Sequence, residues 1–211
     1  MSLTVLRDLA SRRGACALIA IKERSRCKTR LADVLPPPAR MELVRAMLSA
    51  VLHAARNAQT VHSVLVISPE RDTLHADIAV LADTGESLNS ALMQAHRMVR
   101  EFGCHEIVVL PADLPAITPG EIDELVHAGR AGGFAIAPDA AGVGTNALYL
   151  ASTAPFQFQF GPDSQSLHLR EARRLGLNPR VVRLPGLELD VDVPADLERM
   201  EGQPWLTRLR A

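Results

Sequence analysis

Short apolar runs alternate with amphipathic helical patterns along this chain, and that alternation limits the possible folds more than any other feature. Runs of strand length occur at 17–21, 61–67, 78–81, 107–110, 134–137, 147–150, 181–184 and 189–193. Helical patterns follow at 39–52, 87–100, 118–128 and 165–175. This order predicts an α/β fold with a mostly parallel central sheet, helices on both faces, and ligands outside the carboxyl ends of the strands.

Length and composition favour one domain that binds small molecules. The chain has 211 residues, of which 47% are hydrophobic, and we expect the domain at 15–203 between an N-terminal extension (1–14) and a C-terminal tail (204–211). A formal net charge of -1 gives no general attraction to nucleic acid or an anionic membrane. The three cysteines lack CxxC spacing, and no signal-peptide or transmembrane pattern is visible, so a soluble cytoplasmic protein is expected.

Asp113 directly follows the most hydrophobic predicted strand, within Leu110-Pro-Ala-Asp-Leu-Pro115. A residue at that place emerges at the carboxyl end of the sheet, where α/β enzymes build their sites. A turn aspartate that binds its own backbone beside proline is the alternative.

Asp190 and Asp192 lie two positions apart in a predicted extended stretch, and side chains at that spacing share one face. Like charges about 4 Å apart repel by about 4 kcal/mol at an effective dielectric of about 20, so three gathered carboxylates need a cation. Magnesium suits oxygen ligands that also meet substrate phosphates. The alternative is that both aspartates are solvated or cap a helix beginning near Pro194.

The only two lysines of the chain, Lys22 and Lys28, fall in one basic loop after the first predicted strand, together with Arg30. Cations there are suited to hold triphosphate oxygens and to neutralise a pyrophosphate leaving group. The loop lacks the glycine pattern of a P-loop, and a solvated run of charge is the alternative.

Three further loops carry small polar residues. Asn89 follows a possible helix cap at Ser87 and is a candidate to contact a base or ribose. The loops 142–146 and 160–164 are rich in glycine and small hydroxyl or amide groups, and the second one opens a helix, whose free N–H groups favour an anion. They are candidates to hold the phosphate or carboxylate of an acceptor, although ordinary capping by Asp163 or Ser164 explains the second loop equally well.

Taken together and in this order, these motifs resemble one family. They are Ile21-Lys22, Lys28-Thr-Arg-Leu31, Leu88-Asn89, Pro111-Ala-Asp-Leu-Pro115, Gly144-Thr-Asn-Ala-Leu148, Phe160-Gly-Pro-Asp-Ser164 and Leu189-Asp-Val-Asp192. The chain is similar over about 15–200 to the CofC family, the 2-phospho-L-lactate guanylyltransferases.

The resemblance implies a single-domain nucleotidyltransferase fold of the glycosyltransferase-A type. It implies transfer of GMP from GTP onto a three-carbon phospho-acid with release of pyrophosphate, in the biosynthesis of the deazaflavin coenzyme F420. The acceptor would be 2-phospho-L-lactate, phosphoenolpyruvate or 3-phospho-D-glycerate. Members usually form homodimers.

The resemblance also assigns roles to residues. Asp113, Asp190 and Asp192 would hold Mg²⁺, with Asp113, Lys22 and Lys28 catalytic. The nucleotide would meet Lys22, Lys28, Arg30 and Asn89, and the acceptor would meet Thr145, Gly161 and Ser164. This chain has Ser87 where a glycine often precedes the Leu-Asn pair, and an arginine-rich stretch between the lysines.

Two other functions are open at this level. Asp190-Val-Asp192 spells the Asp-x-Asp motif of metal-dependent nucleotide-sugar transferases, although that motif is expected in the middle of such a chain. A GTP-binding regulator without catalysis is the second, and the presence of all three aspartates argues against it.

Overall fold

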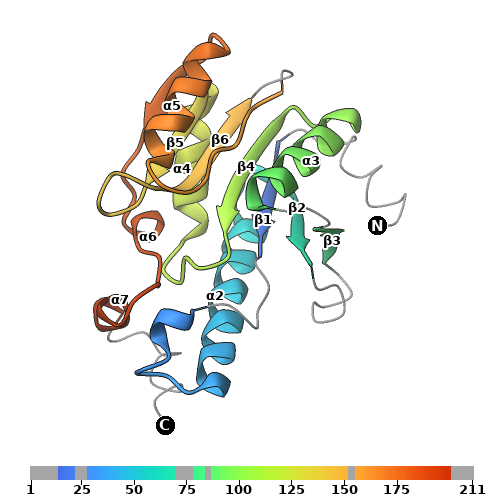
Figure 1. Ribbon diagram of the computed structural model, residues 1–211. Helices are drawn as coiled ribbons and strands as arrows, with labels where there is room; N and C mark the ends of the chain where they lie inside the picture. The colour runs from blue at the N-terminus through green and yellow to red at the C-terminus, as the bar shows by residue number, and fades with distance from the viewer. Residues whose placement is uncertain (1–13, 22–27, 70–77, 84–86, 152–154, 201–211) are drawn as a thin grey trace.

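The computed structural model describes residues 14–21, 28–69, 78–83, 87–151 and 155–200. Within them lies a seven-stranded sheet in the order β3-β2-β1-β4-β6-β5-β7 (Figure 1). The strands are β1 (Ala15–Ala20), β2 (Val61–Ser68), β3 (Ala79–Ala82), β4 (Glu106–Pro111), β5 (Gly133–Pro138), β6 (Thr145–Ala151) and β7 (Asn178–Val181). The predicted α/β fold is confirmed.

The sheet is parallel except at β6, which runs antiparallel to both of its neighbours. Leu148 of β6 lies opposite Val109 of β4. The amino end of β6, beginning at Thr145, therefore lies at the edge where β4 ends and leads into Asp113. One antiparallel strand thus brings two distant loops to the carboxyl edge of the sheet.

Helices cover both faces of the sheet (Figure 1). Successive β1 side chains alternate between two apolar clusters, as expected for a strand buried on both faces. Ala17 and Ile19 pack with α2 and α4, whereas Cys16 and Leu18 pack with α3 and α5. These helices are α2 (Pro37–Asn57), α3 (Leu88–Glu101), α4 (Pro119–Arg130) and α5 (Ser164–Arg174).

A third apolar cluster lies at the amino-terminal half of α2. It joins Leu31, from the short 3-10 helix η2 (Thr29–Leu31), to Val191 and to Leu197 of α7 (Pro194–Arg199). Both Leu31 and Val191 are fully buried. The cluster therefore fixes the segment after Lys28 and the segment between Asp190 and Asp192 on the same helix.

Two expected strands near the carboxyl end are wrong. The strand predicted at 181–184 lies earlier, as β7, and the short helix α6 (Pro185–Glu188) follows it. Residues 189–193 form no strand, because no described strand pairs with them and Pro194 begins α7. Val191 is nevertheless buried between two half-buried aspartates, so the predicted common face of Asp190 and Asp192 remains.

Several predicted helix starts have the expected chemistry. The Ser87 hydroxyl accepts from the Ser90 N–H at 3.2 Å, and Thr118 and Glu121 form a capping box at α4. Asp163 precedes α5 with a left-handed φ of 55°, and its side chain makes no capping hydrogen bond.

Among the described helices, none has both the length and the apolar character needed to cross a bilayer.

Candidate active site

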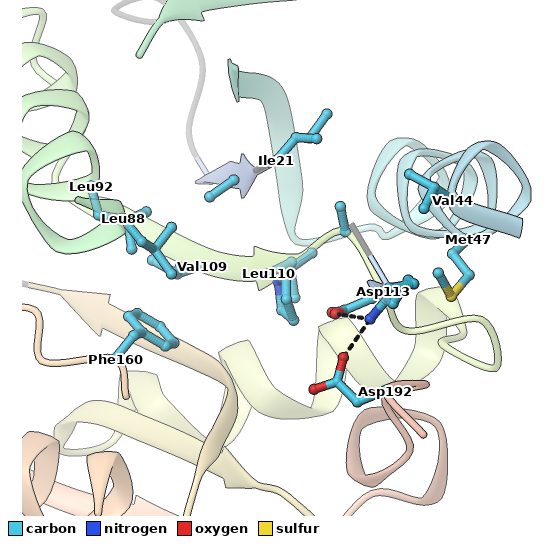
Figure 2. Close-up of a pocket in the computed structure, with 14 residues that line it drawn as sticks. Ile21, Val44, Met47, Leu88, Leu92, Val109, Leu110, Asp113, Phe160 and Asp192 are labelled. Atoms are coloured by element: carbon cyan, nitrogen blue, oxygen red, sulfur yellow. Dashed lines mark hydrogen bonds and ion pairs between the residues drawn. The ribbon is translucent and has the colours of Figure 1, made fainter. Parts of the chain in front are cut away.

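The ammonium of Lys28 joins two carboxylates that are distant in the sequence. Its Nζ donates to Asp113 Oδ2 at 2.8 Å and to Asp192 Oδ1 at 2.7 Å. Figure 2 shows both contacts as dashed lines that run from one nitrogen to Asp113 and to Asp192. The Lys28 side chain is 7% exposed, so this cation is held inside the protein.

Each of the three residues is positioned by its own local structure. Lys28 immediately precedes η2 in a left-handed conformation, with φ 57°. Asp113 follows the end of β4 at Pro111. The backbone N–H of Asp192 donates to Asp196 Oδ2 at 2.8 Å, which ties it to the first turn of α7. The contact is therefore formed by residues whose backbones are separately held.

Burial and charge act in opposite directions on Lys28. Burial lowers the pKa of its ammonium, but the charges and hydrogen bonds of Asp113 and Asp192 raise it, and the pKa ends above its ordinary value. Lys28 is consequently a fixed positive charge near neutral pH.

Asp190 is the third carboxylate of this region. Burial has the largest effect on the pKa of Asp190 and raises it. The negative charge of Asp113 raises this pKa further, and that of Asp192 does so to a smaller extent. The amide of Asn146, at the amino end of β6, donates to Asp190 Oδ1 at 3.5 Å and partly opposes this rise. Asp190 thus interacts electrostatically with Asp113 and Asp192, and the role of the three aspartates as metal ligands stays a prediction.

The donor set suits a hard divalent cation, because it consists of carboxylate oxygens in mutual repulsion. Within the described residues, no three His, Cys, Asp or Glu side chains stand as a ready metal cluster. Instead, Lys28 takes up one oxygen of Asp113 and one of Asp192. A metal held by all three aspartates would therefore share Asp113 and Asp192 with the Lys28 ammonium.

A cavity of about 410 Å³ opens beside the charged contact. Lys28, Asp113 and Asp192 line its polar end. Figure 2 shows Leu88, Leu92, Val109 and Phe160 along one side and Val44 and Met47 along another. An apolar pocket with a few convergent charged groups is typical of a small-molecule site.

The three candidate acceptor residues gather where β6 meets α5. The Ser164 N–H donates to the Gly161 carbonyl at 3.3 Å, and the Gln165 N–H donates to the Val143 carbonyl at 3.1 Å. His168 lies one helical turn after Ser164 in α5, and its Nδ1 is 3.0 Å from Thr145 Oγ1. Since Asn146 contacts Asp190, the acceptor residues adjoin the acidic group.

Asn89 has a clear structural partner. Its Nδ2 donates to the Phe160 carbonyl at 3.1 Å, and its Oδ1 accepts from the Phe160 N–H at 2.8 Å. This pair of bonds fixes Phe160 in the cavity wall. Contact between Asn89 and a nucleoside stays a prediction.

The remaining predicted residues are less informative. Lys22 lies outside the described residues. Arg30 is exposed on η2 and does not line the cavity. Sequence reasoning placed Asn146 and Phe160 only within the candidate acceptor loops 142–146 and 160–164, and it assigned no role to His168. His168 had one usable signal, its spacing of four from Ser164, which places both on one helix face.

Solved structures share this fold. A putative nucleotide-diphospho-sugar transferase from Desulfovibrio desulfuricans has a TM-score of 0.74 at 16% identity, covering 93% of each chain. A 4-diphosphocytidyl-2C-methyl-D-erythritol synthase has a TM-score of 0.58 at 17% identity, covering 90% of this chain and 98% of that one. A Mycobacterium tuberculosis protein in complex with manganese has a TM-score of 0.53 at 20% identity, covering 90% and 99%.

Curated relatives are closer in sequence. The phosphoenolpyruvate guanylyltransferase of Rubrobacter xylanophilus is 39% identical over 190 residues, covering 88% of this chain and 92% of the relative. That of Sphaerobacter thermophilus is 37% identical with the same coverage. Residues 15–202 match the family model described as "Guanylyl transferase CofC like". The chain is therefore an enzyme that transfers a nucleotidyl group, and it belongs to the CofC-like guanylyl transferase family.

Proposed function

We propose that this enzyme transfers GMP from GTP onto the phosphate of a three-carbon phospho-acid and releases pyrophosphate. Phosphoenolpyruvate is the first candidate acceptor, because the curated relatives carry that name. 2-Phospho-L-lactate also carries its phosphate on C2, next to the carboxylate, whereas 3-phospho-D-glycerate carries it on C3. The product would serve the biosynthesis of the deazaflavin coenzyme F420.

The observation that carries this proposal is the Lys28 ammonium between Asp113 and Asp192 at the polar end of the cavity. A fixed cation can stabilise the negative charge that builds up on phosphate oxygens during nucleotidyl transfer, and neighbouring carboxylates can hold a divalent metal. Asp113, Asp190 and Asp192 would hold Mg²⁺. When bound, Mg²⁺ supplies positive charge to the triphosphate oxygens.

The proposed chemistry is one in-line displacement. A phosphate oxygen of the acceptor attacks the α-phosphorus of GTP, and the bond from that phosphorus to the oxygen bridging to the β-phosphate breaks. The electron pair leaves with pyrophosphate, whose charge Lys28 stabilises. The acceptor phosphate is already anionic near neutral pH, so positioning and electrostatics supply most of the acceleration without a general base.

The acceptor would lie between β6 and α5. Thr145, Ser164 and the backbone at Gly161 surround this place, and Asn146 links it to Asp190. Gly161 has φ +136°, a conformation that other residues rarely adopt. Nothing lies within 4 Å of the place where a Cβ would stand, which leaves room for an approaching anion. GTP would occupy the cavity, with its phosphates toward Lys28.

The test is an assay of the purified protein with GTP, MgCl₂ and each of the three acids in turn. We expect pyrophosphate release in step with a guanylylated product of the expected mass. Release of a nucleoside diphosphate from a nucleotide sugar would instead indicate a sugar transferase. GTP binding without turnover would indicate a regulator, and no pyrophosphate with any acid would overturn the proposal.

The same proposal includes a homodimer in the cytoplasm. Sedimentation equilibrium of the purified chain tests the first part, with twice the mass of 22.8 kDa expected.

A further inference from the structure

We propose that His168 is a positioning residue that orients the Thr145 hydroxyl as a hydrogen-bond donor toward the anionic acceptor. This inference rests on the proposed function, because it concerns how the same acceptor is held. Its structural basis is a chain of two hydrogen bonds through one buried imidazole ring.

The backbone determines which ring nitrogen carries the proton. The Gln159 N–H points at His168 Nε2, at 2.9 Å. A backbone N–H only donates, so Nε2 must present its lone pair, and the proton of the neutral ring lies on Nδ1. Nδ1 is 3.0 Å from Thr145 Oγ1, and the imidazole therefore donates to the hydroxyl.

The surroundings keep the ring neutral. His168 is completely buried, and its ring packs against Phe156 and Phe160, with centroids 6.0 Å and 4.8 Å away. Burial lowers the pKa of His168 to about 4, against a raising effect of Glu171. Glu171 is itself engaged by Arg174 at 2.6 Å and by the Gln157 N–H at 2.9 Å. Protonation would also point an N–H at the Gln159 N–H.

The direction of the bond decides what Thr145 offers a ligand. A hydroxyl has one proton, and when a lone pair accepts from the imidazole, that proton is left for another partner. Phosphate and carboxylate oxygens only accept, so they need it. The opposite tautomer would take the proton and turn a lone pair toward the anion. Thr145 stands at the edge shared with Asp113, beside Asn146, where the acceptor would bind.

His168 has two contacts, and two substitutions separate them. The amide of His168→Asn reaches about as far as Nδ1, so it retains a donor for Thr145 and loses the Gln159 contact. The amide of His168→Gln extends toward the place of Nε2, so it retains an acceptor for Gln159 and loses the Thr145 contact. We expect His168→Gln to raise the KM for the acceptor about tenfold or more, with a smaller change in the KM for GTP.

His168→Asn should recover most of that loss, which a purely structural role does not predict. In a Thr145→Val background, where the hydroxyl is gone, His168→Gln should add little further increase in acceptor KM. Equal losses in the Asn and Gln variants, or full additivity with Thr145→Val, would overturn the inference. Circular dichroism and thermal melting of each variant identify any that fail to fold.

A spectroscopic readout does not depend on turnover. Long-range ¹⁵N–¹H correlation spectra of labelled protein report the tautomer of each histidine, and the signals lost in His168→Asn identify His168. We expect a protonated Nδ1 and an unprotonated Nε2 from pH 5 to 8, and the reverse tautomer would refute the inference. Wild-type protein inactive with every acid would overturn the proposed function instead, whereas an active wild type unaffected by His168→Gln would overturn this inference alone.

Discussion

Lys28 and Asp113 are 85 positions apart in the chain, yet Lys28 Nζ lies 2.8 Å from Asp113 Oδ2. The same nitrogen lies 2.7 Å from Asp192 Oδ1, 164 positions away. The residue before η2, the second residue after the end of β4 and the second residue before α7 therefore meet at one cation.

Replacing Lys28 by Met should lower kcat for GMP transfer by roughly 100-fold or more, because the departing pyrophosphate loses a preorganised positive charge. Arg45→Met is the matched control, since Arg45 is an exposed cation on α2. Steady-state kinetics with GTP and the preferred acid measure both variants. Normal turnover by Lys28→Met would remove Lys28 from the mechanism.

Asp190→Asn should abolish divalent-metal binding and raise the melting temperature of the metal-free protein. The raised pKa of Asp190 means that its charged form is disfavoured by folding. The native state then binds more protons than the unfolded state between the two pKa values, so stability falls as pH rises through that window and stays lower above it. An amide removes this penalty.

Asp123→Asn is the matched control for Asp190→Asn. Burial raises the pKa of Asp123, but the hydrogen bonds that it accepts, among them those from the Thr60 hydroxyl and N–H, together outweigh burial. The pKa is therefore lowered, and folding favours the charged form. We expect this variant to melt at a lower temperature than wild type. Differential scanning calorimetry gives the melting temperatures, and electron paramagnetic resonance of Mn²⁺ gives the metal affinities. A fall in melting temperature for Asp190→Asn would contradict the electrostatic picture.

Acid should destabilise the protein between about pH 6.5 and pH 4 through its buried histidines. Burial lowers the pKa of His96 from 6.5 to about 4, with a smaller effect from Arg100. Below pH 6.5 the imidazole of His96 binds a proton in the unfolded state but not in the native state. The contribution of this histidine to the free energy of unfolding is therefore fully present above pH 6.5 and declines as the pH falls toward 4. The shift corresponds to a loss on the order of 3 kcal/mol per histidine.

His96→Leu tests this window. Urea unfolding at several pH values should show a shallower decline in the free energy of unfolding than wild type below pH 6.5. Parallel pH profiles for the two proteins would show that His96 does not titrate as inferred.

Gly186→Ala should destabilise the protein by roughly 1–3 kcal/mol through overpacking. A Cβ on Gly186 would collide with the Glu121 carboxylate and would lie 2.5 Å from the Ala116 carbonyl oxygen. Because Gly186 lies in α6, just before Asp190, metal binding should weaken as well. Gly120→Ala in α4, where nothing lies within 4 Å, should be neutral or stabilising. Calorimetry and Mn²⁺ titration of both variants compare the two sites.

Local patterns were sufficient to predict the alternating elements, because a buried strand such as 107–110 and a helix after three prolines have strong signals. They failed at 189–193, where a pattern typical of a strand finds no partner in the described sheet. Whether an extended segment joins a sheet depends on tertiary neighbours, which periodicity does not contain.

The site was predictable in its charges and less so in its contacts. Asp113 stood out because it follows a strand, and Lys28 because lysine is rare in this chain. The bond from Lys28 to both carboxylates depends on how the third cluster packs Leu31 and Val191 on α2. The roles of Asn146 and His168 depend on the antiparallel course of β6, which no local motif reveals.

The third cluster includes Val191, which follows all seven described strands in the chain. During synthesis, all seven described strands have been made by Val181, whereas Asp190 and Asp192 leave the ribosome later. The contact between Lys28 and Asp192 can therefore form only after all seven described strands have been synthesised. A nascent chain that has all seven described strands still lacks Asp190 and Asp192, so the charged centre is completed only after the last of these strands has been made.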